Sequence, residues 1–285
     1  FIMTVFLRHL LHHASGRIGV ALLGGIILLT CWPSLVGAHS PEQIDLQALL
    51  QPPSWQHPLG TDLFGRDLLS RILYGGRHTL VIGMGVVSIA FTFGVVIGSI
   101  AGFKGGWMDS IAMRLIDAVL SFPALVLAIA LSAAMGAGLP SATLAISVTL
   151  TPQFARLARN QAIRLSGMLY IDAAHALGVP EHTIMIRHIL RNGLVPLLTL
   201  APLCVGTAIL QVASLGFLGL GAQPPTAEWG ADIAMNLDYV RVAPWTVFST
   251  GGAIVLSVLA FNLLADATGA YFSPNQRLTG GANRA

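Results

Sequence analysis

Charged side chains are scarce in this sequence. Only 9% of its 285 residues are Asp, Glu, Lys or Arg, whereas 54% are hydrophobic, and the mean hydropathy is +0.75. A soluble globular domain carries roughly 25% charged residues. This chain has too little charge to cover a surface that faces water, so its composition indicates a membrane protein. We expect its membrane spans to be helices and its fold to be all-α.

Residues that would support catalysis or cofactor binding are also missing. The single lysine, Lys104, follows Phe103, so no Gly-Lys-Ser/Thr phosphate loop is present. The two cysteines lie far apart in apolar segments, and there is no His-Glu-x-x-His pattern. Three histidines near the N-terminus (His9, His12 and His13) lack a fourth metal ligand. We therefore expect no enzymatic activity, cofactor or metal on this chain, and no nucleic-acid partner.

Ionisable groups are nearly absent from the middle of the apolar segments. Arg114, Asp117 and Asp266 are the exceptions, and each lies within about two turns of an expected cytoplasmic end, where snorkelling or pairing is easy. Proton-coupled and many ion-coupled carriers need such groups at membrane depth. An autonomous secondary transporter or channel for a small polar solute is therefore the less favoured alternative.

Stretches free of Asp, Glu, Lys and Arg mark the membrane spans. Five occur, and the third (118–155) is too long for one helix, since about 20 residues suffice to cross the bilayer. It divides at the turn signal Gly-Ala-Gly-Leu-Pro over 136–140. The six predicted spans are 18–36, 79–103, 111–135, 140–156, 193–215 and 245–266.

The distribution of Lys and Arg gives the orientation. With the N-terminus inside, eleven of the fifteen fall in inner segments, and only four arginines (Arg66, Arg71, Arg77 and Arg241) fall outside. Both termini are predicted to be cytoplasmic. A cleaved signal peptide ending near 36–38 is an alternative, but its apolar run is longer than such segments require.

The predicted organisation has four parts. They are a cytoplasmic tail (1–17), a first span with an outer loop (18–78), a transmembrane domain (79–267) that contains an inner loop over 157–192, and a second cytoplasmic tail (268–285). Within the second span, Gly94, Gly98 and Gly102 recur every four residues on one helical face. Such small residues permit close helix packing, either inside the chain or against another subunit.

The long inner loop predicts two short helices joined by an elbow. A helical stretch over 168–177 meets Gly178, a residue suited to end a helix. Pro180 and Glu181 then suit the first turn of a second short helix that ends near Arg191. A side chain in place of Gly178 is expected to intrude on the turn.

Apolar residues are more frequent in this loop than an exposed inner loop needs. We expect one face of the elbow to dock onto another protein, with packing beneath the chain's own bundle as the alternative. The apolar residues are Ile184, Ile186, Ile189 and Leu190.

The same loop carries a family resemblance. Its order Asp172-Ala173-Ala174, Gly178 and His188-Ile189-Leu190 resembles the EAA motif of membrane subunits of ATP-binding-cassette importers. Asp replaces the usual Glu at the start of the motif, and Arg191 stands where Pro is common. In that family the motif forms coupling helices that contact the cytoplasmic ATPases. The resemblance implies this role for Asp172, Ala173, Ala174, Gly178, Glu181, Arg187, His188 and Arg191.

Further motifs extend the resemblance over residues 55–274. They are His57-Pro-Leu-Gly-Thr-Asp-Leu-Phe-Gly-Arg-Asp67, Ser121-Phe122-Pro123 and Ser214-Leu-Gly-Phe-Leu-Gly-Leu-Gly-Ala-Gln-Pro-Pro-Thr-Ala-Glu-Trp-Gly230. Together they resemble the C-type permease of dipeptide, oligopeptide and nickel importers, with Leu-Gly-Phe in place of the usual Leu-Ser-Phe. Asp62, Arg66 and Asp67 also suit a compact loop held by local ion pairs.

The resemblance implies a bacterial inner-membrane permease subunit in a heterodimer. Its partners would be a B-type permease, two cytoplasmic ABC ATPases that bind the ATP and Mg, and an external solute-binding protein that contacts the outer loop and residues 222–241. The substrate would be a peptide or a metal chelate such as a nickel complex. Uncharged polar candidates for the translocation path are Gln153, Gln211, Ser214 and Asn262.

Overall fold

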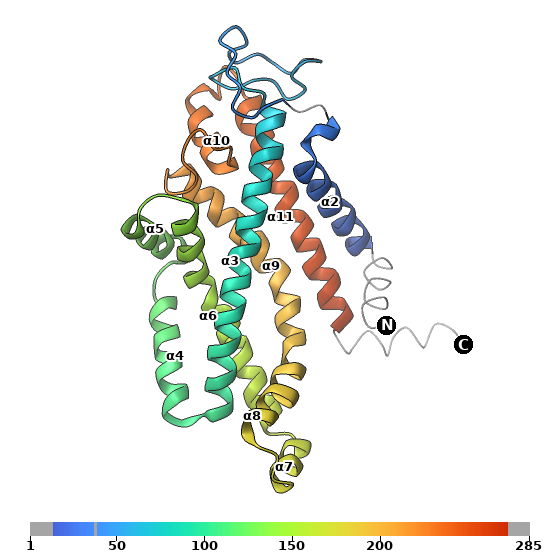
Figure 1. The fold of residues 1–285 in the computed structure, drawn as a ribbon, viewed down its shortest axis with the longest axis vertical. Coiled ribbons are helices and arrows are strands. Elements are labelled where there is room, and N and C mark those ends of the chain that lie inside the picture. Colours follow the sequence, from blue (N-terminus) through green and yellow to red (C-terminus); the bar gives the residue numbers. More distant parts are fainter. Residues whose placement is uncertain (1–13, 37–38, 273–285) are drawn as a thin grey trace, which may run out of the picture.

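The computed structural model describes residues 14–36 and 39–272. All the helices and strands assigned within these residues are helices, with no strand among them. The predicted all-α class is therefore confirmed for this part of the chain. Figure 1 shows a long bundle in which the helices run roughly along one axis. In chain order the elements are α2 (Ala14–Cys31), η1 (Pro33–Val36), α3 (Leu68–Lys104), α4 (Gly106–Leu120), α5 (Ala124–Met135), α6 (Leu139–Ser166), α7 (Leu169–Ala176), α8 (Glu181–Thr183), η2 (Ile184–Leu190), α9 (Arg191–Phe217), α10 (Trp229–Asn236), η3 (Leu237–Tyr239) and α11 (Trp245–Phe272).

Helices α3 and α6 run parallel in close contact at the centre of the bundle. A Cβ at Gly94 would lie 2.8 Å from the carbonyl oxygen of Thr151, and one at Gly102 would lie 2.5 Å from that of Arg159. At Gly98 the carbonyl oxygen of Ala155 would be only 2.1 Å away. The structure thus places the small-residue face of α3 against α6 of the same chain, where only glycine allows this approach.

The remaining long helices pack around this pair in alternating directions. Helix α9 runs antiparallel to α6, because Gly193 at its start lies beside Gln161 and Gln211 near its end lies beside Thr149. Helix α2 packs on α11, where Gly19 meets Leu263. The main hydrophobic core lies between α3, α6, α9 and α11 and includes Phe154.

The predicted span over 111–135 is wrong as a continuous helix. Helix α4 ends at Leu120, α5 begins at Ala124, and the two are bent by 91°. Pro123 lies at the break, since proline has no N–H to donate and disfavours a helical conformation at the residue before it. The motif Ser121-Phe122-Pro123, expected within a span, therefore divides it.

Other boundaries also differ from prediction. Helix α3 begins at Leu68, eleven residues before the predicted span, because the Asp67 carboxylate accepts a hydrogen bond from the N–H of Ser70 and caps it. Helix α2 ends at Cys31 rather than 36, just before Pro33. Helix α6 continues beyond 156 to Ser166. The expected features within 1–13, 37–38 and 273–285 lie outside the described residues.

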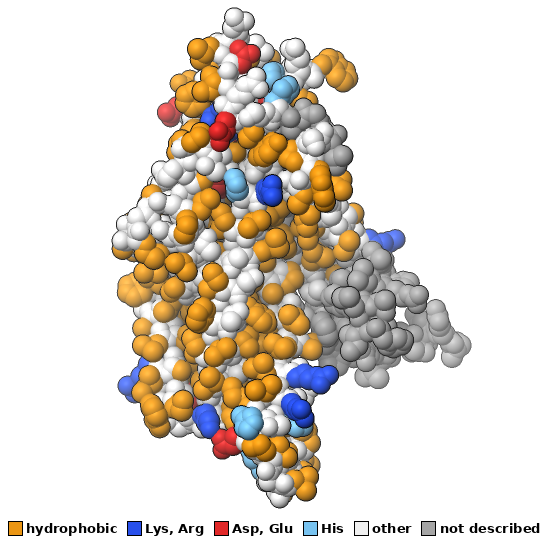
Figure 2. Space-filling model, in the orientation of Figure 1, with side chains coloured by type: hydrophobic (Ala, Val, Ile, Leu, Met, Phe, Trp, Pro, Cys, Tyr) orange, Lys and Arg blue, Asp and Glu red, His pale blue; other side chains and the backbone are white. Residues whose placement is uncertain are grey.

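By length and composition, four of the described helices are able to cross a membrane, or five if the bent α4–α5 pair counts as one crossing. Helix α6, which contains the predicted span 140–156, does not meet this criterion. Hydroxyl, amide and arginine side chains recur along it and lower its hydropathy. Figure 2 shows hydrophobic side chains over the middle of one face and most of its charged side chains toward its two ends.

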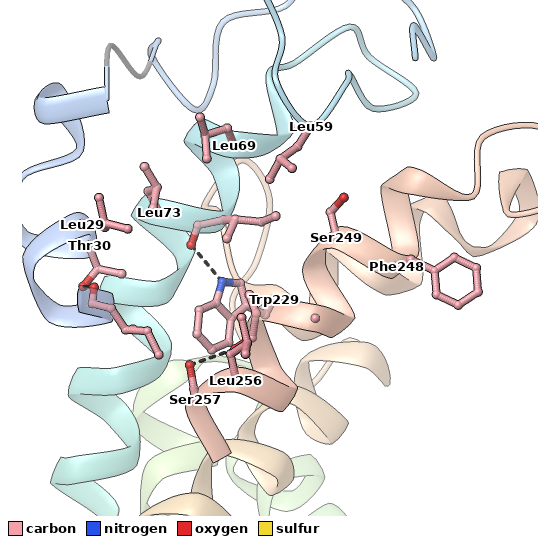
Figure 3. A pocket seen from close by; sticks show the side chains of 14 residues that line it. Leu29, Thr30, Leu59, Leu69, Leu73, Trp229, Phe248, Ser249, Leu256 and Ser257 are labelled. Carbon is pink, nitrogen blue, oxygen red and sulfur yellow. Dashed lines mark hydrogen bonds between the residues drawn. The ribbon is translucent and has the colours of Figure 1, made fainter. Parts of the chain in front are cut away.

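One end of the bundle, where α3 begins, is the end that the sequence predicts to face outside, and we call it the outer end. There a pocket of about 380 Å³ lies between α2, α3 and α11. The indole of Trp229 forms part of its wall, and its Nε1 donates a hydrogen bond of 2.9 Å to the Ile72 carbonyl (Figure 3). Thr30 and Ser257 are among the few polar residues in an otherwise apolar lining. Trp229 thus joins the short helix α10 to the long helix α3.

The close contact of α3 and α6 gives a prediction. Replacing Gly98 with Val should lower the free energy of unfolding by at least about 1–3 kcal/mol, because the backbone of α6 blocks the new side chain. Gly85→Val is the matched control, since no heavy atom lies within 4 Å of a Cβ there. Thermal unfolding of the purified chain in mild detergent measures the difference. Equal midpoints for both variants would contradict the packing described.

Candidate functional site

The elbow lies at the opposite end of the bundle, which the sequence predicts to be cytoplasmic and which we call the inner end. It begins with α7 and turns at Gly178. The N–H of Gly178 donates to the carbonyl of His175 at 2.9 Å, and the N–H of Val179 donates to that of Ala174 at 3.1 Å. This pair of bonds, with Gly178 at φ +73°, is a Schellman motif. The turn expected from the sequence is therefore present.

Open space surrounds the turn at Gly178. No heavy atom lies within 4 Å of a Cβ built there. The expectation that a side chain would intrude on neighbouring atoms is therefore wrong. A substitution acts instead through the positive φ, which β-branched residues tolerate poorly and Asp or Asn tolerate better.

One face of the elbow packs beneath the chain's own bundle. Ile171 and Ala174 of α7 and Ile184 and Ile189 of η2 form a buried cluster with residues at the end of α6 that include Leu165. Leu190 packs against the main core. Three of the four apolar residues expected to dock onto a partner therefore pack inside the chain, as the alternative prediction has it. Ile186, which is 61% exposed, is the exception.

The opposite face of the elbow is apolar and open. Leu169 is 86% exposed and Leu177 is 84% exposed, at the two ends of α7. Ile186 and Tyr170 of the elbow are also exposed, and we call these four apolar side chains the elbow knob. Sequence reasoning missed Leu169 and Leu177, although both lie beside the Asp-Ala-Ala motif and the pattern of buried Ile171 and Ala174 predicts which face is left outside.

Most of the residues for which the family resemblance implies ATPase contact are exposed. Ala174 is buried in the internal cluster, and His188 is half-buried with its ring 6.2 Å from that of Tyr170. The exposed ones are Asp172, Ala173, Gly178, Glu181, Arg187 and Arg191.

The second half of the elbow is not a separate short helix. Residues 181–217 form one continuous helical stretch, in which η2 has π-helical hydrogen bonding and leads directly into α9. The predicted break near Arg191 is therefore wrong, because Arg191 continues the helix where the related motif often has proline. A displacement of the elbow would consequently pass straight into α9.

Ion pairs join the inner ends of the helices. Lys104, at the end of α3, pairs with Glu181 of the elbow, and hydrogen bonding to this lysine lowers the pKa of Glu181. The Arg159 guanidinium of α6 donates two hydrogen bonds to Asp109 of α4. Arg156 also bonds to Asp117, at 2.6 Å. The pairs of Arg159 with Asp109 and of Arg156 with Asp117 link α4 to α6.

At the outer end, buried ion pairs hold the loop over 39–67. Arg66 Nε donates to Asp62 at 2.6 Å, while Nε and Nη2 of Arg71 on α3 both donate to Oδ1 of Asp232 on α10. Arg71 also donates to the Pro41 carbonyl at 2.9 Å. All four charged side chains are at most 6% exposed. The expected local pairing of Asp62 with Arg66 is thus accompanied by a long-range pair that the sequence did not reveal.

Glu228 is a further buried carboxylate in this region. It caps α10 by accepting hydrogen bonds of 2.9 Å from the N–H groups of Gly230 and Ala231. Burial nevertheless raises its pKa to about 7, against these two bonds. A Cβ at Gly216 would lie 2.0 Å from its Oε2, so the glycine that replaces the usual serine of Leu-Ser-Phe leaves room for this carboxylate.

The four candidates for the translocation path do not form one cluster in the structure. Gln153 and Gln211 both lie at the contact of α6 with α9, where Gln211 is 3.5 Å from Thr149 Oγ1. Ser214 bonds to its own helix through the Leu210 carbonyl at 2.7 Å. Asn262 lies on α11, facing Gly206.

Comparison with protein families gives a match over residues 94–278. The matching family is described as the binding-protein-dependent transport system inner membrane component.

Curated relatives match most of the chain. A probable D,D-dipeptide transport system permease protein, DdpC of Escherichia coli K12, is 44% identical over 85% of this chain and 81% of its own length. The dipeptide transport system permease protein DppC of Alkalihalophilus pseudofirmus is 41% identical over 87% and 82%. The glutathione transport system permease protein GsiD of Pectobacterium atrosepticum is 38% identical over 91% and 86%.

A solved structure shares the fold. A chain from the inward-facing MetNI methionine ABC transporter is 18% identical, with a TM-score of 0.53 over 70% of this chain and 96% of that chain.

The buried pair of Arg71 and Asp232 gives a second prediction. Arg71→Met should lower the free energy of unfolding by about 3–5 kcal/mol, because it leaves a buried carboxylate without its partner. Arg77→Met, at an exposed position on the same helix, is the control. Adding Asp232→Asn to Arg71→Met should restore part of the loss. A thermal unfolding midpoint for Arg71→Met equal to that of the control would refute this role.

Glu228 gives a pH prediction. Its folded pKa of about 7 exceeds the ordinary value of 4.5, so the folded state binds this proton more tightly than the unfolded state, and stability falls as pH rises from about 4.5 to 7. The difference corresponds to at most about 3 kcal/mol. Glu228→Gln should flatten this part of the stability profile, whereas Glu42→Gln, at an exposed outer position, should leave it unchanged. Thermal unfolding at several pH values measures the slope, and an unaltered slope in Glu228→Gln would contradict the assignment.

Proposed function

Because this chain belongs to the family of binding-protein-dependent transport system inner membrane components, we propose that it forms half of the translocation pathway of an ATP-driven importer. It is a multi-pass protein of the inner membrane. The observation that carries the proposal is the elbow knob, a group of apolar side chains at the inner end of the bundle with no cover in the described chain.

The partners we propose are a B-type permease, two cytoplasmic ABC ATPases and an external solute-binding protein. The ATPases would bind ATP and Mg, since this chain has no Gly-Lys-Ser/Thr sequence. The elbow knob would enter a groove on one ATPase. Exposed charged residues around it (Asp172, Glu181, Arg187 and Arg191) would fix its orientation through a polar rim.

The topology we propose has six crossings with both termini cytoplasmic. Helices α2, α3, α6, α9 and α11 would each cross once, and the bent α4–α5 pair would supply one further crossing. The alternating directions of the long helices support this order. The polar side chains along α6 suit a helix surrounded by other helices rather than by lipid. Its contacts with α3, α5 and α9 support that position.

The coupling mechanism follows from the continuity of the elbow with α9. Closure of the ATPase pair would displace α7, and η2 would pass this motion to α9 without an intervening loop. The pair of Lys104 with Glu181 would carry part of the motion to α3. The π-helical hydrogen bonding of η2 gives this junction a register that differs from the α-helix after it, as is frequent at functional sites.

The substrate class we propose is short peptides. The curated relatives described above are named for D,D-dipeptide, dipeptide and glutathione transport, and this supports a peptide over a nickel chelate. Gln153 and Gln211 are the candidates we favour for the path, because both lie where α6 meets α9. Selectivity would depend chiefly on the solute-binding protein.

An autonomous secondary transporter or channel remains the competing function. It would need no groove for the elbow knob and no partner with an ATP site. The structure offers no observation that favours it over the importer.

The elbow knob gives the test. Leu177→Glu should abolish recovery of the ATPases when the tagged chain is purified from its native membrane in mild detergent, because a charge would be buried in an apolar groove. Folding should be unaffected, since Leu177 is 84% exposed. Val242→Glu is the matched control, because Val242 is 72% exposed in the outer segment before α11.

Mass spectrometry of the purified material gives the readout. The importer account expects a second permease with both variants and ATPase subunits only with Val242→Glu. Equal recovery of ATPases with both variants would refute the docking role of the knob. Absence of any ATPase from the unaltered chain would refute the importer itself.

A further inference from the structure

A cluster of two imidazoles and one carboxylate lies on the outer end of the molecule, away from the elbow. It consists of His39, which follows η1, His57 of the outer loop, and Asp67, which caps α3. One ligand atom from each lies within 4.8 Å of the other two. We propose that these three residues bind a divalent transition-metal ion of the Zn²⁺ type.

The distances suit such an ion. His57 Nδ1 and Asp67 Oδ1 are 3.0 Å apart. Neighbouring ligand atoms in a tetrahedral zinc site lie about 3.3 Å apart, given bond lengths near 2.0–2.1 Å. The rings of His39 and His57 are 5.6 Å apart and tilted by 43°, so both can turn a nitrogen toward one point. His39 is exposed, and rotation of its side chain would close the longest separation.

Hydrogen bonds from Ser70 fix the orientation of the Asp67 carboxylate, as a metal ligand requires. Its Oδ2 accepts hydrogen bonds from Ser70 N at 2.8 Å and Ser70 Oγ at 2.6 Å, which leaves Oδ1 for the ion. Such outer bonds orient ligating carboxylates in metal sites. The nearby Arg66 and Arg71 pair with Asp62 and Asp232 instead.

The charge of Asp67 is therefore poorly balanced within the described chain. Its side chain is only 3% exposed, and the single ion-pair partner found for it is His57, which is charged only when protonated. A bound cation would neutralise this carboxylate while leaving His57 neutral.

The surroundings leave room for an ion with a water ligand. The three residues line a pocket of about 220 Å³ with Gln43, Asp45 and Gln56. Two imidazoles with one carboxylate suit zinc, nickel or copper, whereas magnesium and calcium prefer oxygen ligands alone. A fourth position filled by water would complete a tetrahedral site.

The ion would connect segments that lie far apart in the sequence. His39 lies next to the segment that leaves α2, and Asp67 starts α3. Binding would fasten the first helix and the outer loop to the central helix of the bundle. This site is independent of the elbow and of the proposed import function, so either proposal can fail without the other.

The test measures Zn²⁺ bound to the full-length chain, purified with its partners through a tag that contains no histidine. His9, His12 and His13 are changed to Ala in every sample, to remove the other histidine group of the sequence. The protein is treated with chelator, dialysed against Zn²⁺ and analysed by elemental mass spectrometry. We expect one ion per chain, bound saturably.

His39→Ala is the decisive variant, because His39 is exposed and its loss should leave the metal-free protein equally stable. It should weaken Zn²⁺ binding by more than about tenfold, since loss of even an outer-shell partner often costs that much. His182→Ala, exposed on the elbow, is the control and should bind normally. His39→Gln repeats the test with a side chain of similar length.

Thermal unfolding gives a second readout. Zn²⁺ should raise the unfolding midpoint of the parent protein and of His182→Ala, but not that of His39→Ala. The proposal is overturned if the parent binds no Zn²⁺ saturably, or if His39→Ala binds it as well as the parent does. The second result would reduce the cluster to a hydrogen bond between His57 and the capping Asp67.

Discussion

The close approach of α3 and α6 is the contact on which the other features of this molecule depend. Three glycines on α3 bring its backbone against that of α6, and nothing larger fits at Gly98. In lipid no hydrophobic force holds helices together, so backbone packing of this kind has to supply the cohesion. Because α3 extends over 37 residues, about 55 Å of helix, this one pair connects the inner and outer ends of the bundle.

Each end of this pair carries a different kind of site. The elbow packs its buried face on the inner end of α6 and leaves the apolar elbow knob exposed. Lys104 of α3 pairs with Glu181 of the elbow, and Arg159 of α6 pairs with Asp109 of α4. At the outer end, Arg71 and Trp229 fasten α3 to α10, and the loop over 39–67 is folded around buried charges. A permease needs both ends to move in a coordinated way, and this arrangement provides a continuous connection.

Local signals in the sequence predicted the features that depend on local chemistry. Charge-free stretches indicated the long helices, and Gly178 indicated the turn of the elbow because a Schellman motif favours glycine. The resemblance to importer permeases, based on motifs, agrees with the matching family. The break at Pro123 was missed because an apolar run has the same composition whether its helix is straight or bent by 91°. Charge counting also gave no indication that Arg71 would pair with Asp232, since 161 positions separate them and only the fold brings them together.

We propose that this chain transports its substrate only when partner ATPases bind and hydrolyse ATP. Uptake of a labelled dipeptide into vesicles, with the purified complex in the membrane and the solute-binding protein outside, tests it directly. We expect uptake that requires ATP on the ATPase side of the membrane. Uptake should stop when the phosphate-loop lysine of the partner ATPases is replaced. Uptake that continues without ATP, driven by an ion gradient across the vesicle membrane, would contradict it.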